Sequence, residues 1–439
     1  MSNPLVITLA IIICGLSFFK PIVGVFIIII TSWLGAIFPA EGVFTLNRIL
    51  AIICLAGVFA PQLIKPDKSP VRKFSTLEVL FIIYFAILFL SSFYSFSNPR
   101  AQGLLLDMMT GFIFYYLIKV TVVSKTHLEN LVKTLVVISL VVAAYSIYAA
   151  QNADPLTKRI SGEFQVNLAG IICYVGVVCT LWLSWAKKLP VLAAGIISMI
   201  LISVIFLSGN RSGFVALLFS AMLFALRIFL TRGKRAWMIG TLILFTMVFI
   251  ASFNLMQNYF PLAVERVFSV LPTSDSAITD LRRIDLAKIA WLLFLNHPIL
   301  GIGFGNFPLY YASYSQEFAG HQTVAHNLFM STLAEAGLMG IISLISIYLY
   351  IIYAGLKALF FKKDDPGIFD PWFPLILFVG LNIINALFHS TVIDRPMFTI
   401  FAINMIVLRN QQTKPMAADE LDKQTSLLPK YKGVGSGVL

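Results

Sequence analysis

Apolar runs close to 20 residues long recur along almost the whole of this 439-residue chain, separated by polar connectors. A helix needs roughly 20 residues to cross the about 30 Å of hydrocarbon in a bilayer. The chain is 59% hydrophobic and 12% charged, with a mean hydropathy of +0.89, whereas soluble domains average roughly half apolar and a quarter charged residues. This excludes an ordinary soluble domain. The sequence predicts an all-α, polytopic integral membrane protein with about 12 transmembrane helices.

The predicted spans follow the apolar runs and leave one run unassigned. They cover residues 22–38, 46–64, 76–96, 104–123, 131–150, 166–186, 190–207, 213–230, 237–256, 327–355, 372–388 and 396–409. An earlier run, 5–19, is short for a span, and Lys20 and Pro21 separate it from the next run. This run can form a full helix, half of a tight hairpin or an interfacial start.

The formal net charge of +12 is concentrated in alternate connectors. The basic residues there are Lys65, Lys68, Arg72, Lys73, Lys187, Lys188, Arg232, Lys234, Arg235, Lys357, Lys362 and Lys363, with several more in the tail after Arg409. Lysine and arginine favour cytoplasmic loops, so these connectors are predicted to face the cytoplasm. By parity, the opposite face receives residues 39–46, 97–103, 151–165, 208–212, 257–326 and 389–395. The charge therefore indicates topology rather than a nucleic-acid partner.

These assignments divide the chain into four regions. They are a transmembrane helical region at 1–256, a large, partly helical loop on the non-cytoplasmic face at 257–326, carboxy-terminal transmembrane helices at 327–410, and a polar tail at 411–439 that is predicted to be disordered and cytoplasmic. Four cysteines, at positions 14, 54, 173 and 179, lie in apolar runs without metal-ligand spacing. That pattern favours small core residues over disulfides or metal ligands.

The segment 257–326 is long for a connector, which indicates a structure or a function of its own. Its apolar residues Leu281, Ile284, Ala287, Trp291 and Leu295 recur at spacings of three and four, as on one face of a helix at the membrane surface. The charged residues Arg282, Asp285 and Lys288 fall elsewhere on this helix. His297 and Pro298 end it, and GIGFGN follows. No strand precedes these glycines, so they predict a tight turn rather than a nucleotide-binding loop.

Two arginines of the predicted outer face can bind phosphate. Arg211 lies in the very short connector SGNRSG, and Arg283 lies on the amphipathic helix. A guanidinium group stays charged and donates two parallel hydrogen bonds, which matches a phosphate group. Either arginine alone is also compatible with a carboxylate partner or with contact to lipid phosphate.

His326 and Asn327 precede the apolar run that begins in AHNLFMSTLAEAGLMG. An imidazole with an ordinary pKa of about 6.5 can accept a proton from a hydroxyl group near neutral pH. The alternative is an interfacial histidine that binds a headgroup or caps the helix. Together with the two arginines on the same predicted face, His326 predicts a site for a diphosphate and an attacking hydroxyl.

Three runs of the sequence resemble the O-antigen ligase and polymerase superfamily. They are RISGEFQVNLAG at 159–170, SGNRSG at 208–213, and RIDLAKIAWLLFLNHPILGIGFGNF at 283–307 leading to HNLFMSTLAEAGLMG. The similarity extends over roughly residues 159–409. One departure concerns Asn167, which follows Val166 where many relatives have a proline, and we interpret Asn167 as structural.

The resemblance implies glycan transfer from undecaprenyl diphosphate on the periplasmic face of the bacterial inner membrane. Arg211 and Arg283 match the two arginines that hold the diphosphate, and His326 matches the histidine that activates the acceptor hydroxyl. Arg282, next to Arg283, is the residue to test for an error of register. The remaining candidates for a supporting role are Arg159, Asn327 and Glu335.

No cofactor and no metal are expected for this reaction. Arginine can stabilise a departing diphosphate without a metal ion, and the predicted outer face has no tight acidic pair, although separate carboxylates could still converge. Glu335 lies about 13 Å along its helix from His326, at 1.5 Å per residue. Glu335 is therefore interpreted as an intramembrane partner for a cation or a packing hydrogen bond rather than as a second base.

The sequence thus predicts an O-antigen ligase that transfers a lipid-linked glycan to the sugar of a lipid A core. The partners would be the undecaprenyl-diphosphate-linked donor, the lipid A core or another glycan acceptor, and membrane lipids, with no nucleic acid. A repeat-unit polymerase of O-antigen or exopolysaccharide and a protein O-glycosyltransferase are the alternatives within the class. A lipid-linked oligosaccharide flippase or other transporter is the alternative from another class, for which repeated halves and interrupted helices at matched positions would be expected.

Overall fold

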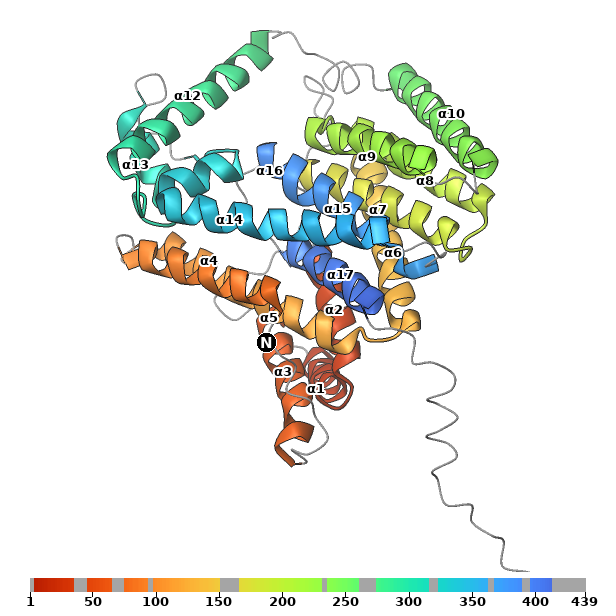
Figure 1. Ribbon diagram of the computed structural model, residues 1–439, viewed down its shortest axis with the longest axis horizontal. Helices are drawn as coiled ribbons and strands as arrows, with labels where there is room; N and C mark the ends of the chain where they lie inside the picture. The colour runs from red at the N-terminus through yellow and green to blue at the C-terminus, as the bar shows by residue number, and fades with distance from the viewer. Residues whose placement is uncertain are drawn as a thin grey trace, which may run out of the picture.

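The computed structural model describes residues 4–34, 46–64, 75–93, 98–150, 166–230, 235–259, 274–315, 323–361, 367–388 and 395–412 (Figure 1). Within these ranges the regular structure is helical and contains no strand, as the predicted all-α class requires. The elements are α1 (Pro4–Phe19), α2 (Pro21–Trp33), α3 (Leu46–Ile64), α4 (Thr76–Ser92), α5 (Pro99–Thr121), α6 (Lys125–Ala150), α7 (Val166–Trp185), α8 (Val191–Leu207), α9 (Arg211–Leu230), α10 (Arg235–Tyr259), α12 (Ser274–Asn296), α13 (Phe307–Tyr314), α14 (Leu328–Phe361), η3 (Gly367–Phe369), α15 (Trp372–Phe378), η4 (Val379–Ile384), α16 (Asn385–Phe388) and α17 (Arg395–Gln412).

The chain is a multi-pass membrane protein. Among the described residues, five helices are long and apolar enough to cross a membrane: Pro99–Thr121, Lys125–Ala150, Leu168–Trp185, Leu328–Leu359 and Gly367–Leu387. Shorter apolar helices cover Pro21–Trp33, Asn47–Ala60, Thr76–Ser92, Val191–Leu207 and Pro396–Asn410. Every predicted span falls largely on a helix of the structure. The run 5–19 forms α1, which packs on α2 and α3, and Pro21 begins α2, where its missing N–H costs nothing.

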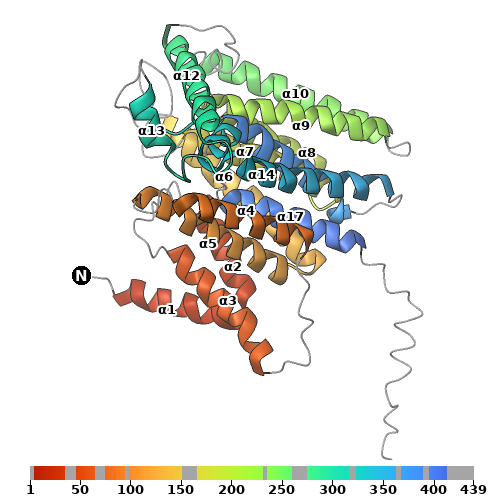
Figure 2. The ribbon, with the colours of Figure 1, turned by 60° about the vertical axis from the view of Figure 1, so that its left-hand side comes forward.

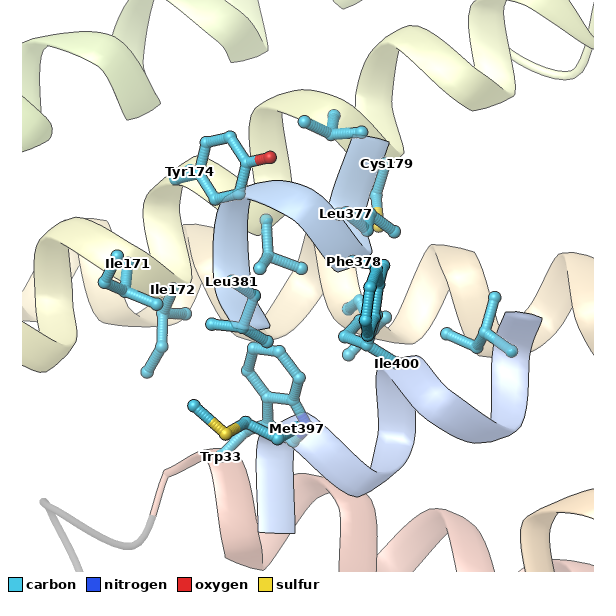
Figure 3. Packing of buried hydrophobic residues seen from close by; sticks show 14 of the residues in the cluster. Trp33, Ile171, Ile172, Tyr174, Cys179, Leu377, Phe378, Leu381, Met397 and Ile400 are labelled. Atoms are coloured by element: carbon cyan, nitrogen blue, oxygen red, sulfur yellow. The ribbon is translucent and has the colours of Figure 1, made fainter. Parts of the chain in front are cut away.

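The core of the bundle lies where α7, the α15–η4 segment and α17 meet (Figure 3). Tyr174 and Cys179 of α7 lie against this segment, near Leu377, Phe378 and Leu381. Three of the four cysteines are fully buried and all four are free thiols, which agrees with their interpretation as packing residues. In Figure 1, α1 and α3 lie on one side of this core, and α8 to α10 lie on the other.

Three ion pairs link helix ends at one end of the bundle: Lys119 with Glu78 at 2.6 Å, Lys188 with Glu129 at 2.9 Å, and Arg227 with Asp370 at 3.3 Å. We call this the basic end. The opposite end, the loop end, holds α12, α13 and the start of α14 (Figures 1 and 2). Most of the connectors that charge and parity assigned to the two faces lie outside the described residues. The side of the membrane that each end faces stays a prediction.

Helix α12 has two apolar faces, of which the sequence pattern predicted one. Its predicted stripe is solvent-accessible, with Ile284, Trp291 and Leu295 exposed. A second stripe is buried in a small core with α13, the turn before it and the start of α14; its residues are Leu286, Ile289, Ala290 and Leu293. The described part of the segment 257–326 therefore has a core of its own. Residues 260–273, 316–322 and 413–439 lie outside the described residues.

Candidate active site

Arg211 is the first residue of α9 and follows a tight turn at the loop end. Gly209 takes a left-handed conformation there, with φ 59°, which glycine adopts without strain. The side-chain oxygen of the buried Asn210 accepts hydrogen bonds from the backbone N–H groups of Ser212, at 3.0 Å, and Gly213, at 3.3 Å. Asn210 is thus the N-cap of α9 and fixes the half-buried Arg211 beside it.

Two glycines bring α7 close to this turn. A Cβ added at Gly170 would lie 2.8 Å from the Asn210 Cβ and from the Ser208 Oγ, and one added at Gly213 would lie 3.2 Å from the Gly170 carbonyl oxygen. Both positions therefore need glycine for close helix packing. Gly170 belongs to the motif at 159–170 and Gly213 to the motif at 208–213, so the two motifs are in direct contact in the structure.

His326 lies in a short non-helical stretch between α13 and α14. It is exposed and has a left-handed backbone, φ 51°, which is uncommon for a residue other than glycine. The neighbouring Ala325 and Leu328 are buried, at 5% and 0% exposure. Asn327 caps α14, because its side-chain oxygen accepts a hydrogen bond from the Met330 N–H at 3.0 Å. The cap belongs to Asn327, which leaves the imidazole of His326 without that role.

The residues that follow Arg211 and His326 both contact one short helix, α16. The Asn327 Nδ2 donates a hydrogen bond to the Leu387 carbonyl at 3.2 Å, and the Ser212 hydroxyl lies 3.2 Å from the Asn385 Oδ1. Each contact is made by the residue directly after His326 or Arg211. The sequence predicts a shared site for Arg211 and His326, but no signal in it points to α16 as the element that contacts both of their neighbours.

The structure places Arg283 on α12, with an exposed side chain. Two residues on, the Asp285 carboxylate accepts hydrogen bonds from the Tyr311 hydroxyl at 3.0 Å and the Ser315 hydroxyl at 2.7 Å, and these fasten α13 to α12. Among the described residues, none forms an ion pair with Arg283. The side chains of Arg282 and Asn167, and the whole of Arg159, lie outside the described residues.

The turn at 297–303 fits into a break in α14. Gly337 interrupts the helix with φ 62° and ψ −158°, a conformation that is essentially restricted to glycine. The backbone groups that the break frees are paired with the turn: Ile302 N–H with Ala334 C=O at 2.9 Å, Gly303 N–H with Glu335 C=O at 3.1 Å, Leu338 N–H with Pro298 C=O at 2.8 Å, and Met339 N–H with Ile299 C=O at 3.3 Å. The glycines at 301, 303 and 305 all have positive φ, which confirms the predicted tight turn.

Side chains from distant parts of the chain hold this turn in place. The buried Glu335 carboxylate accepts a hydrogen bond from the Phe307 N–H at 3.0 Å, at the start of α13. The Ser91 hydroxyl of α4 lies 2.6 Å from the Glu335 carbonyl oxygen, and the Asn98 side chain donates to Gly305 C=O at 3.3 Å. The contact with Phe307 agrees with the interpretation of Glu335 as a packing hydrogen-bond partner.

A comparison with protein families finds one match that covers the loop end and its candidate residues. Residues 196–345 match the family model described as O-antigen ligase, which is about a third of the chain. The matched range contains Arg211, Arg283 and His326, as well as the docked turn. No curated protein sequence matches the chain.

Proposed function

The O-antigen ligase domain at residues 196–345 supports membership of the O-antigen ligase and polymerase superfamily, and from this premise we propose a specific glycan transfer. The family supports a membrane glycosyltransferase of the ligase or polymerase type. We propose that the donor is a glycan on undecaprenyl diphosphate, and that the acceptor is a sugar hydroxyl of a lipid A core. The active site would lie at the loop end, facing the periplasm across the inner membrane.

The proposed reaction forms one glycosidic bond and breaks another bond at the same anomeric carbon. The acceptor oxygen attacks that carbon while its proton passes to the neutral imidazole of His326. The bond from the carbon to the diphosphate oxygen breaks, and undecaprenyl diphosphate leaves with the electron pair. Arg211 and Arg283 stabilise the charge that develops on the diphosphate, so no metal ion is needed in this scheme.

One observation carries the proposal: α16 holds the residue after His326 and the residue after Arg211 within one helical turn. A base and an anion-binding group must stand on opposite sides of a single reacting carbon, so the mechanism requires His326 and Arg211 to lie close to each other. Arg211 also stands at the amino terminus of α9, where the helix dipole adds positive potential for a phosphate.

The exposed stripe of α12 supports a donor that arrives from the lipid. Ile284, Trp291 and Leu295 are 53%, 50% and 56% exposed, and tryptophan is enriched at membrane interfaces. An amphipathic helix with this pattern lies in the interface with its apolar face in the acyl region. Arg283 on the same helix would then meet a diphosphate headgroup whose polyprenyl chain stays in the bilayer.

The break in α14 favours an enzyme over a flippase. Transporters use interrupted helices whose free backbone groups bind the substrate or coupling ion. In this chain the freed groups around Gly337 are paired with the turn at 297–303. The break thus serves to anchor the loop end.

Deletion of the gene tests ligase against polymerase. Loss of a ligase should leave polymerised glycan on its lipid carrier, and loss of a polymerase should leave single repeats attached to the acceptor. Accumulation of carrier-linked polymer, seen by gel analysis of extracted glycolipids, is the expected result. Single repeats on the lipid A core would overturn ligation and support the polymerase alternative.

Exchange of the arginines tests the diphosphate site. Arg211→Lys and Arg283→Lys keep the charge but lose the planar fork, so we expect both to lose most turnover while the proteins remain folded. Arg282→Ala is the matched control and should be milder. The assay uses purified enzyme with undecaprenyl-diphosphate-linked glycan. Full loss in Arg282→Ala with activity retained in Arg283→Ala would show that the register on α12 is wrong by one residue.

Cysteine labelling tests the proposed sidedness. In a cysteine-free background, Ser276→Cys in α12 should react with an impermeant thiol reagent added to intact spheroplasts. Thr126→Cys, at the exposed start of α6 near the basic end, should react only after lysis. The reverse pattern would invert the protein and place the proposed site in the cytoplasm.

A further inference from the structure

Helix α16 contacts both halves of the proposed site through neighbouring residues. On one side the Leu387 carbonyl accepts the hydrogen bond of Asn327 at 3.2 Å. On the other side Asn385 lies 3.2 Å from the Ser212 hydroxyl, which is itself 2.7 Å from the cap residue Asn210. The two contact points of α16 are two residues apart. A single helical turn therefore sets the distance between the backbone at His326 and the backbone at Arg211.

The contacts on the arginine side are buried, which makes them costly to lose. Asn385, Ser212 and Asn210 are 8%, 1% and 3% exposed. A buried polar group that loses its partner keeps the full cost of leaving water, so this cluster favours one arrangement. The arginine turn is thus fixed relative to α16 rather than only packed near it.

A π-helical turn sets the orientation of α16. Residues Val379–Ile384 form η4, in which the chain holds more residues per turn than an α-helix. Such a turn rotates every later residue about the helix axis, by about 100° for one extra residue. The Tyr174 hydroxyl donates to the Ile376 carbonyl at 3.0 Å, just before this turn, and stabilises it from α7. Without η4, Asn385 and the Leu387 carbonyl would face other neighbours.

The π-helical turn η4 also contains a buried polar side chain that costs stability. Asn382, in its middle, is fully buried, and neither its side-chain oxygen nor its nitrogen has a hydrogen-bond partner among the described residues. Native proteins pair nearly all such groups, and π-helical turns occur often at functional sites. A segment that retains an unpaired amide and a rare helical turn is expected to serve a purpose other than stability.

We propose that α16 is the positioning element of the active site, with Asn327 and Asn385 as positioning residues that hold the base and the diphosphate-binding arginine at a fixed separation. This inference rests on the proposed function of His326 and Arg211. Neither asparagine contacts the reacting atoms in this scheme. Their loss should misplace the two groups relative to each other, and a shift of about 1 Å can lower a rate by about 100-fold.

Asn327→Ser tests the histidine side. Serine still caps α14, because its oxygen can accept the Met330 N–H, but it is too short to donate to the Leu387 carbonyl. We expect kcat to fall by about 10- to 100-fold, with the KM for undecaprenyl-diphosphate-linked glycan within about twofold of wild type and the Tm unchanged. A kcat within about twofold of wild type, or a fall in Tm that accounts for the lost activity, would overturn the inference.

Asn385→Ala and the double variant test whether α16 couples the two sides. If one element sets one separation, the second change should add little to the first, whereas independent local supports should multiply their effects on kcat. Asn404→Ser is the matched control, because Asn404 makes the same type of amide bridge, to Pro374 C=O at 3.0 Å, between α17 and α15. It should lower Tm without changing kcat of the folded enzyme. Multiplicative effects in the double variant would refute the coupling.

A parallel His326→Ala variant separates the two levels of the proposal. If His326→Ala is inactive and Asn327→Ser is normal, only the role of α16 fails. If His326→Ala is active, the assignment of the base fails, and the positioning role built on it falls with it.

Discussion

Replacement of His326 is expected to lower turnover by about 10² to 10⁴, the usual contribution of a general base, or about 3 to 5 kcal/mol of barrier. His326→Asn is the sharpest variant, because asparagine tolerates the left-handed backbone found at this position but cannot act as the base. Donor binding should persist, since the arginines hold the diphosphate. Steady-state kinetics and binding of the lipid-linked donor measure the two effects separately.

His297→Ala is the matched control for this result. His297 is also exposed and lies in the same part of the chain, at the end of α12, but its described hydrogen bonds are made by backbone atoms. Its replacement should leave turnover close to wild type. A chelator should not change wild-type activity, because the proposed scheme uses no metal ion. Near-normal turnover by His326→Asn, or chelator inhibition that divalent cations reverse, would refute the mechanism.

Gly337→Ala is expected to have the largest effect on stability. Its backbone conformation is essentially restricted to glycine, and an added Cβ would overlap the main chain of Ile299 in the docked turn. Neither backbone can move without breaking the hydrogen bonds around it. We expect a loss of about 3 kcal/mol or more, seen as a lower Tm and a lower yield of folded protein in detergent.

Gly103→Ala is the control for a glycine in a membrane helix. An added Cβ there meets nothing within 4 Å, and alanine favours a helix by up to about 1 kcal/mol over glycine. Its Tm should be equal to or above that of wild type. A Gly337→Ala protein as stable as Gly103→Ala would show that the break in α14 is not fixed by the turn at 297–303.

The helices could be predicted from sequence because their signal is local. Apolar runs predict the helix ranges, since a helix in lipid must satisfy its own backbone hydrogen bonds. The break at Gly337 could not be predicted in this way, because a lone glycine in an apolar run is usually tolerated within a continuous helix. Its conformation depends on a turn that precedes α14 in the chain.

The candidate site likewise contains residues that could be predicted from the sequence and residues that could not. The chemistry of Arg211, Arg283 and His326 marks them as candidates in the sequence, and the residues that follow Arg211 and His326 contact one helix, α16. Asn385 and the Leu387 carbonyl could not be predicted as site groups, because an asparagine in an apolar run and a backbone carbonyl carry no sequence signal of their own. The buried face of α12 was missed because the stripe of Ile284 and Trp291 already accounted for the helical period.

The anchoring of the turn at 297–303 has a consequence for domain exchange between relatives. Ser91 and Asn98, which hold the turn, lie before the range that matches the O-antigen ligase family, and Asn385 lies after it. A chimera that exchanges only residues 196–345 would separate the transplanted turn from its partners Ser91 and Asn98, and would separate Ser212 and Asn327 from their partners on α16. A graft that keeps these contacts must therefore also carry α4, α5 and α16, so the structural unit to be transplanted is larger than the range that matches the family.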